Sequence, residues 1–352
     1  MSIIKKVLGR VPGGAEYEQY LLTDDATGEF VSVLNLGCIL QQIQVRDAGG
    51  RLVDVAVGYD TVGEYAATRS FFGAVLGRYA NRIGGGFFSI DGTEYQTTKN
   101  ERGNTLHGGA SGFHNKLFDA EVQGEELVLR RVSADGEEGF PGCLTLTERV
   151  SFRAGRLDLR YEAVCDKATV VNISNHSFFN LDGQGNGNVL EQTLCLAASR
   201  VCAVDSALIP TGRLLDVRGT GFDFTTPKPI GKDIHAADPM IAAAHGYDVC
   251  YAVDSWDGRL KKIAEAASAK TGIHLTAYTD LPAVQLYTGM LLGKLPIFTN
   301  GKQGSRYVEY GGFCLETQHF PNAMNLPDIG DNVVLRPGGK MRCETVYEFS
   351  AS

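Results

Sequence analysis

The chain has 352 residues, of which 43% are hydrophobic and 21% are charged. This balance is typical of a soluble globular protein, and it excludes a disordered chain, which combines low hydrophobicity with high net charge. The formal net charge of −8 disfavours nucleic-acid binding, because an acidic surface repels phosphate backbones. No apolar run approaches the roughly 18 residues that span a bilayer, and no signal-peptide pattern follows the basic residues near the amino terminus. We therefore expect a cytoplasmic protein with no membrane segment.

Short alternating segments predict antiparallel strands. Apolar and polar residues alternate in Leu127–Arg130, in Leu144–Val150 and in Leu157–Ala163. A period of two places one face of a strand in the core and the other in water, which is typical of antiparallel sheets. Asp-Gly pairs such as Asp91-Gly92 predict tight hairpin turns, because both positions tolerate positive φ.

Helical patterns are few. Thr61–Thr68 predicts one or two helical turns, and Lys232–Ala244 predicts a longer helix in which Pro239 is an internal obstacle. Strand and helix patterns do not alternate regularly, which disfavours a parallel doubly wound sheet. The sequence therefore predicts an all-β fold, a large antiparallel β-sandwich with few short helices. We expect a single domain over residues 1–352, with loops gathered over one face.

The glycine-rich segments do not predict a nucleotide site. Gly84–Gly86 runs into an apolar strand pattern, and no helix pattern follows Gly183–Gly187. A dinucleotide-binding fingerprint needs a strand, then glycines, then a helix. The eight cysteines are scattered without a C-x-x-C pair, which disfavours a structural zinc site. We expect neither a metal nor a cofactor.

Two loop segments carry the first candidate functional residues. Arg82 beside Asn81 offers a set of donors to hydroxyl oxygens, although a surface arginine and a turn asparagine are the commoner explanation. His107 precedes two glycines, on a loop where backbone can come close to a ligand. A loop histidine without a function is an equally open explanation.

Four further polar residues stand in apolar surroundings. His176 lies near the end of a strand pattern, where a hydrogen-bonded structural histidine is the alternative. An ionised Asp248 among apolar neighbours needs hydrogen bonds, unless it is a turn residue bonded to its own backbone. Gln285 is explained more simply as a residue on the solvent face of a strand. Glu316, in an apolar strand pattern, is the strongest candidate, and its alternative is a structural carboxylate held by backbone N–H groups.

Taken together, these residues suit a neutral polyhydroxylated ligand. Amides and charged groups bind hydroxyls, and aromatic faces cover the apolar side of a sugar ring. A carboxylate together with an imidazole also suits paired general base and general acid catalysis.

Several motifs together make the chain resemble the galactose mutarotase (aldose 1-epimerase) family. They occur in the family's order and span nearly the whole chain. The most specific are Gly77–Ile83 (GRYANRI), Asn104–Gly109 (NTLHGG), Asn175–Leu181 (NHSFFNL), Gly246–Asp248 (GYD) and Leu315–Pro321 (LETQHFP). None of these motifs would identify the family alone.

The resemblance implies a large β-sandwich that interconverts the α and β anomers of free aldohexoses such as galactose and glucose, without a cofactor. It implies that Glu316 is the general base and His176 the general acid, and that His107 is a second imidazole near the ring oxygen. Four residues match hydroxyl-binding positions of the family: Arg82, Asn81, Asp248 and Gln285. A monomer or a homodimer is the default expectation.

The chain also departs from the family pattern. Phe118, His114 and Asn322 differ from the residues usual at those positions, and we expect them at the rim of the site. These differences leave the preferred sugar open.

Alternative functions remain open. A hexose-phosphate 1-epimerase of the same fold would need extra Arg or Lys residues converging on a phosphate. A non-catalytic carbohydrate-binding protein would need hydroxyl binders and aromatic side chains, but not Glu316 and His176 together. A structural interaction domain would need none of the candidate residues.

Overall fold

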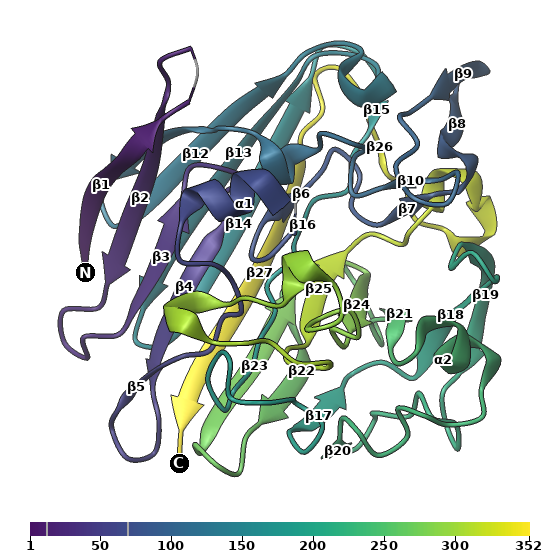
Figure 1. Cartoon of the computed structure of the whole chain (residues 1–352). Helices are drawn as coiled ribbons and strands as arrows, with labels where there is room; N and C mark the ends of the chain where they lie inside the picture. Colours follow the sequence, from purple (N-terminus) through teal and green to yellow (C-terminus); the bar gives the residue numbers. More distant parts are fainter. Residues whose placement is uncertain (12, 69) are drawn as a thin grey trace.

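The computed structural model describes residues 1–11, 13–68 and 70–352. Within these residues, antiparallel strands form three large sheets and four two-stranded ones (Figure 1). The predicted all-β, antiparallel fold is therefore confirmed.

One layer of the fold is a nine-stranded sheet. In spatial order, its strands are β11 (Asp119–Gln123), β12 (Glu126–Ser133), β13 (Leu144–Arg153), β14 (Arg156–Cys165), β27 (Met341–Ala351), β23 (Ile273–Thr279), β22 (Lys261–Ala267), β17 (Thr193–Leu196) and β20 (Lys228–Pro229). The three alternating segments of the sequence lie within β12, β13 and β14. Burial alternates along β13 from Leu144 to Phe152, as the period of two predicts.

Two five-stranded sheets form the other layer. The first is ordered β1 (Ser2–Arg10), β2 (Glu16–Thr23), β3 (Phe30–Leu34), β4 (Leu40–Arg46) and β5 (Leu52–Asp54). The second is ordered β19 (Pro210–Asp216), β18 (Arg200–Val204), β21 (Asp248–Ala252), β24 (Ala283–Tyr287) and β25 (Cys314–Gln318).

Four short strand pairs complete the fold. They are β6 (Val75–Leu76) with β16 (Ser174–Asn175), β7 (Arg82–Ile83) with β10 (Thr105–Leu106), β8 (Phe87–Ile90) with β9 (Thr93–Gln96), and β15 (Thr169–Val170) with β26 (Val334–Leu335). Asp91 and Gly92 join β8 to β9 with φ values of 51° and 78°, which confirms the predicted hairpin turn.

The main hydrophobic core lies between the two layers. One cluster of buried side chains includes Val33 from the first five-stranded sheet, Leu146 and Leu159 from the nine-stranded sheet, and Tyr251 and Leu315 from the second five-stranded sheet. The nine-stranded sheet thus packs one face against both smaller sheets, which is the predicted β-sandwich. Fully burying one such side chain contributes about 1.5–3 kcal/mol.

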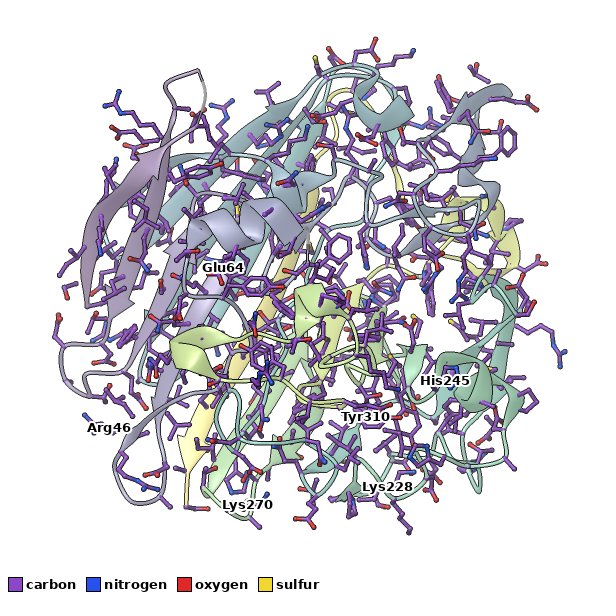
Figure 2. The ribbon with its side chains drawn as sticks, in the orientation of Figure 1. Arg46, Glu64, Lys228, His245, Lys270 and Tyr310 are labelled. Atoms are coloured by element: carbon purple, nitrogen blue, oxygen red, sulfur yellow. The ribbon has the colours of Figure 1, made fainter. Side chains whose placement is uncertain are left out.

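The helix α1 (Val62–Thr68) forms where the sequence predicts one or two turns. Thr61 and Glu64 exchange hydrogen bonds at its start: the Thr61 N–H donates to Oε2 of Glu64 over 2.9 Å, and the Glu64 N–H donates to Oγ1 of Thr61 over 3.3 Å. Figure 2 labels Glu64 on this helix. This capping box satisfies two N–H groups that a helix start leaves without an internal partner.

The helix α2 (Pro239–Ala244) is shorter than the predicted Lys232–Ala244. Pro239 does not interrupt it but begins it, because proline needs no N–H partner in the first turn. The side chain of Asp238 caps the helix by accepting from the N–H groups of Met240 and Ile241. No helix in the described ranges 1–11, 13–68 and 70–352 is long and apolar enough to cross a membrane.

The second five-stranded sheet carries polar side chains on the face opposite the core. On β25, Leu315 enters the main core, so its neighbour Glu316 points to the other face. The register pairs Gln285 of β24 directly with Glu316, which places both side chains on that same face.

Candidate active site

The loops above this sheet face enclose a cavity of about 290 Å³. Six of the seven predicted site residues line it: Asn81, Arg82, His107, His176, Asp248 and Glu316. Residues from five separate parts of the chain therefore meet in one place, as a shared ligand site requires.

Gln285, the seventh predicted residue, lies beside this cavity rather than in its wall. Its Nε2 donates to Oδ1 of Asp248 over 2.6 Å. The side chain therefore holds Asp248 from within the sheet.

His176 is fixed by backbone hydrogen bonds at the end of β16. Its N–H donates to the carbonyl of Ala74, and its carbonyl accepts from the N–H of Gly73, both over 2.9 Å. These bonds continue the pairing of β16 with β6 and turn the imidazole toward β25.

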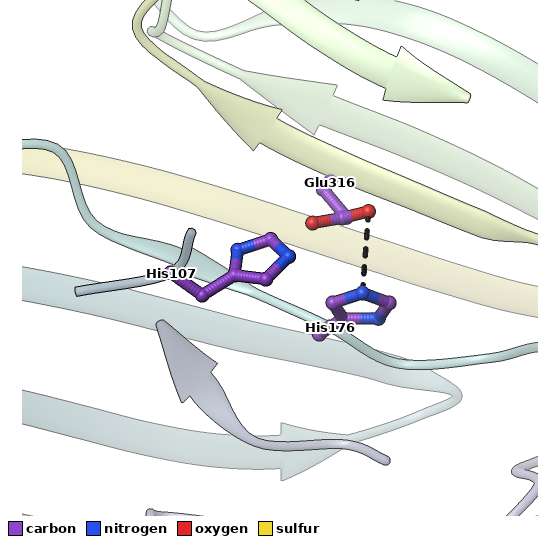
Figure 3. A group of neighbouring side chains, drawn as sticks. All are labelled: His107, His176 and Glu316. Atoms are coloured by element: carbon purple, nitrogen blue, oxygen red, sulfur yellow. Dashed lines mark ion pairs between the residues drawn. The ribbon is translucent and has the colours of Figure 1, made fainter. Parts of the chain in front are cut away.

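His176 and Glu316 face each other across the cavity floor (Figure 3). Nε2 of His176 lies 3.7 Å from Oε1 of Glu316. The other ring nitrogen, Nδ1, lies 3.5 Å from Sγ of Cys314, two residues earlier on the same strand. His176 is 6% exposed and Glu316 2% exposed, so this pair is almost completely removed from water.

Burial governs the electrostatics of the pair. It lowers the pKa of His176 to about 4. It also raises the pKa of Glu316 well above its usual value, and the nearby charge of Asp248 adds to this rise while Arg82 opposes it. Burial thus disfavours both the imidazolium and the carboxylate, so it favours the neutral pair, which holds one transferable proton.

His107 follows β10 and is bonded to Asn81 twice. Its backbone N–H donates to the Asn81 carbonyl, and the Asn81 N–H donates to Nδ1 of the His107 ring, both over 3.1 Å. Burial lowers the pKa of His107 well below its usual value, and the charges of His176, Arg82 and His114 lower it further. His107 is therefore a neutral imidazole.

Arg82 lies between two carboxylates. Its Nε is 3.5 Å from Oε2 of Glu101, and one of its terminal nitrogens is 3.5 Å from Oδ2 of Asp248. Although burial opposes the charge, Asp248 and Glu101 together raise the pKa of Arg82. The guanidinium is thus a permanent cation whose remaining donors are available to a ligand's hydroxyl oxygens.

Aromatic side chains, which the sequence analysis did not single out, form much of the cavity wall. Phe71, Phe178 and Tyr287 all line it. The ring of Phe71 lies 4.9 Å from that of His107, 4.5 Å from that of His114 and 5.9 Å from that of His176. Phe71 has a φ of 62°, which is unusual for a bulky residue. The motifs named above did not indicate its place in the site, because the nearest of them begins at Gly77.

The far wall of the cavity is formed by α2 and the chain beyond it. His245 directly follows α2 and lines the cavity (Figure 2). Tyr310 donates its hydroxyl proton to the carbonyl of His245 over 2.7 Å, which fixes this wall.

One carboxyl oxygen and one amide oxygen at the site, both buried, have no hydrogen-bond partner within the described residues. They are Oε2 of Glu316 and Oε1 of Gln285. An unsatisfied buried polar atom costs about 1–3 kcal/mol. A ligand that brings hydroxyl donors would remove this cost, as a sugar does.

Three side chains of the site also have the composition of a metal-binding group. His107, His176 and Glu316 each offer one ligand atom, and these atoms lie within 4.8 Å of one another. Two imidazoles and a carboxylate suit a divalent transition metal such as Zn²⁺. An imidazole binds a metal only through a nitrogen without a proton. The protonation of His107 therefore decides whether the group is able to bind one.

The three residues that depart from the family pattern are all buried. Phe118 packs in the main core, and its ring lies 6.2 Å from that of Phe113, so it is not at the rim of the cavity. His114 contacts Phe71 from behind the cavity wall. Oδ1 of Asn322 accepts from the N–H of Gly84 over 3.0 Å.

Known proteins resemble this chain over its whole length. The sequence profile of the aldose 1-epimerase family matches residues 18–348. A galactose mutarotase of Rattus norvegicus is 37% identical over 355 residues, which cover 100% of both chains.

Two solved structures have the same fold. An aldose epimerase homologue from C. elegans superposes with a TM-score of 0.86 at 26% identity, covering 95% of this chain and 99% of that one. A galactose 1-epimerase from Lactobacillus acidophilus superposes with a TM-score of 0.86 at 25% identity, covering 100% of this chain and 99% of that one. The chain belongs to the aldose 1-epimerase family.

Proposed function

We propose that this protein is an isomerase that interconverts the α and β anomers of free aldohexoses such as galactose and glucose. The observation that carries the proposal is the facing pair of His176 and Glu316, 3.7 Å apart on the floor of a cavity lined by hydroxyl-binding and aromatic side chains. The full-length similarity to galactose mutarotases supports the same reaction.

The reaction begins with a proton transfer inside the pair. Movement of the Glu316 proton to Nε2 of His176 leaves a carboxylate beside an imidazolium without changing the net charge of the site. This transfer avoids the large cost of creating an isolated charge in a buried place. It produces the base and the acid in one step.

Ring opening then uses both groups. The Glu316 carboxylate takes the proton of the anomeric hydroxyl, whose O–H electrons form the aldehyde C=O. The C1–O5 bond breaks, and its electron pair takes the proton from Nε2 of His176. The aldehyde turns about its C1–C2 bond and recloses on the other face, with neutral His176 now taking the proton of the C5 hydroxyl and Glu316 returning one to the aldehyde oxygen. Each assisted transfer contributes about 10²–10⁴-fold to the rate.

The remaining residues hold the sugar. Arg82, Asp248 and Asn81 bind hydroxyl groups, and Gln285 supports Asp248 through its 2.6 Å hydrogen bond. Phe71, Phe178 and Tyr287 offer rings to the apolar side of the sugar. Holding the substrate between acid and base adds the orientation contribution to the rate.

The acidic partners of Arg82 disfavour the hexose-phosphate alternative. Glu101 and Asp248 already neutralise this cation, and a phosphate would lie against their negative charges. We further propose that residues 1–352 act as one cytoplasmic domain, as a monomer or a homodimer, which gel filtration would establish.

Polarimetry tests the proposal. Freshly dissolved α-galactose and α-glucose should reach their equilibrium rotation faster with the protein, while glucose 6-phosphate should relax at nearly its uncatalysed rate. Glu316→Gln, which keeps the shape of the side chain, should lower kcat at least about 100-fold, the loss expected for a general base. Sugar binding without any acceleration would instead favour a carbohydrate-binding protein.

A further inference from the structure

The two imidazoles of the site differ in how their second ring nitrogen is held. Nδ1 of His176 lies 3.5 Å from the Cys314 thiol, which is able to donate or accept only weakly. Nδ1 of His107 accepts a hydrogen bond from a backbone N–H, that of Asn81, over 3.1 Å. A backbone amide is always a donor, so this second contact fixes the tautomer.

We propose that the Asn81 main chain locks His107 as an Nε2–H hydrogen-bond donor, so that His107 presents a fixed proton to the sugar and does not transfer protons. This inference rests on the proposed function for its kinetic consequence, but not for the tautomer itself. Asn81 thereby becomes a positioning residue through its backbone, in addition to the hydroxyl-binding role proposed for its side chain.

The local backbone is built to make this contact. Asn81 and His107 have φ values of 65° and 51°, so two non-glycine residues in the left-handed region face each other. They extend the pairing of β7 with β10, in which Arg82 is opposite Leu106. The side-chain Oδ1 of Asn81 accepts from the Arg82 N–H over 2.9 Å, and asparagine tolerates the left-handed region better than most residues. Strained positions of this kind cluster at functional sites.

The surroundings of the His107 ring also disfavour a second proton on it. The titratable and charged groups next to it are His114, His176, Arg82 and Glu316. Arg82 is a cation, and the two histidines become cations when they are protonated. Protonating Nδ1 would break the bond from Asn81 and leave two N–H groups pointing at each other. Nδ1 of His176 lies beside the Cys314 thiol rather than a backbone N–H, so His176 does not have this obstacle.

Two acceptors are open to the Nε2–H group of His107, one in the protein and one in a bound sugar. Figure 3 shows the His107 ring turned toward the space between Glu316 and His176. Oε2 of Glu316 has no hydrogen-bond partner within the described residues, and the ligand atoms of Glu316 and His107 lie within 4.8 Å of each other. An oxygen of a bound sugar would accept a hydrogen bond from the same N–H, so His107 would hold the oxygen whose charge changes as the ring opens. The same proton blocks metal ligation by His107.

Nuclear magnetic resonance of protein carrying ¹⁵N-labelled histidine tests the tautomer directly. Long-range ¹H–¹⁵N correlations should show His107 as the neutral Nε2–H form, unchanged between about pH 5 and 9. His107→Gln identifies its signals. An Nδ1–H pattern, or a ring that titrates in this range, would overturn the inference even in an active enzyme.

Two pairs of variants separate the roles. His107→Gln keeps an amide N–H near the position of Nε2, so kcat/KM should fall only about tenfold, as for one weakened hydrogen bond, whereas His107→Leu should lose considerably more. Equal losses in both variants would overturn the donor role.

Asn81→Gly keeps the N–H and the left-handed backbone, so the His107 pattern in the magnetic resonance spectra should persist. Asn81→Val disfavours that backbone and should release an Nδ1–H fraction, and an unchanged pattern in folded Asn81→Val would exclude Asn81 as the positioning residue.

Discussion

Nε2 of His176 lies 3.7 Å from Oε1 of Glu316, in a place where neither side chain is more than 6% exposed. At this separation and burial we expect the two groups to titrate as a unit, because the charge of one depends on the proton of the other. In the proposed mechanism the active form is the one with a single transferable proton, wherever in the pair that proton resides. Its limits in pH are set by adding a second proton to His176 and by removing the proton of Glu316.

The pH dependence of activity follows from these limits. Since burial holds the pKa of His176 at about 4, kcat/KM should stay level through mildly acidic pH and fall as the pH drops through about 4, when both groups become protonated. Burial raises the pKa of Glu316, so ionisation of the pair, and any loss of activity that it causes, lies well above the usual carboxyl range. Rates of α-galactose relaxation across pH, corrected for the uncatalysed reaction, would show this. A fall centred near the usual histidine value of about 6.5 would contradict it.

Replacing Cys314 should affect turnover more than sugar binding. Its Sγ lies 3.5 Å from Nδ1 of His176 and forms no hydrogen bond with any other described side chain of the site. Cys314→Ala should lower kcat by about 2–10-fold, the value of one net hydrogen bond, with little change in KM. Cys314→Ser should restore part of the rate because a hydroxyl oxygen is a better acceptor than a thiol for the Nδ1–H of His176. Cys343→Ala, at a buried thiol of the nine-stranded sheet, is the matched control and should leave kcat unchanged.

Removing the Asp248 carboxylate should weaken sugar binding. Asp248 accepts from Gln285 over 2.6 Å and lies 3.5 Å from Arg82, so its loss leaves both donors without their partner. Asp248→Ala should raise KM by about 10–100-fold, as expected for a hydrogen bond to a charged group. Gln285→Leu should raise KM by less, because it leaves the carboxylate in place. Steady-state polarimetry over a range of galactose concentrations separates the two constants, and a change confined to kcat would argue against these roles.

The His107 tautomer also predicts the response to metals. Two ligands remain when His107 presents N–H, which is fewer than the three protein ligands of typical catalytic zinc sites. Chelators should therefore leave the activity unchanged. Added Co²⁺ should not produce the visible absorption of tetrahedral cobalt at this site. Any cobalt absorption that does appear should be the same in His107→Gln. His274→Asn, at an exposed histidine of β23, is the control for binding at the surface.

The alternation of residues was enough to predict the strands, but not the arrangement of the loops. Period two along Leu144–Val150 gave β13 correctly, because a half-buried strand must alternate. The cavity depends on contacts between segments far apart in the sequence, and no local pattern contains them. Gln285 illustrates this point: the sequence favours a position on the solvent face of a strand, but the residue is 3% exposed and its Nε2 donates to Asp248. The start of α2 was available from the Asp238-Pro239 pair, which is a typical helix start.

The alternation along β13 also places a glutamate, Glu148, on the face of the strand that points into the core. It occupies a core-facing position of β13, between Leu146 and Val150, and is 0% exposed. The register places it opposite Leu129 on one side and Tyr161 on the other. Neither carboxyl oxygen has a hydrogen-bond partner among the described residues. Burial raises the pKa of Glu148 to about 8, which Cys38 and Tyr161 only partly counteract.

This carboxyl should make the fold less stable as the pH rises. Below about pH 4.5 Glu148 is protonated in both the folded and the unfolded chain, so it does not make the free energy of unfolding depend on pH. Between about 4.5 and 8 the unfolded chain loses the proton and the folded chain keeps it, so the free energy of unfolding falls with each pH unit by about 1.4 kcal/mol, and it levels off above about 8. The total loss of stability is several kcal/mol.

Glu148→Leu, which places an apolar side chain between apolar neighbours, should remove this dependence of the stability on pH and raise the stability at pH 8 much more than at pH 5. Urea unfolding at the two pH values measures the difference, with Glu94→Gln on the exposed strand β9 as the control. Equal changes at both pH values would mean that Glu148 is already ionised in the folded protein at pH 5.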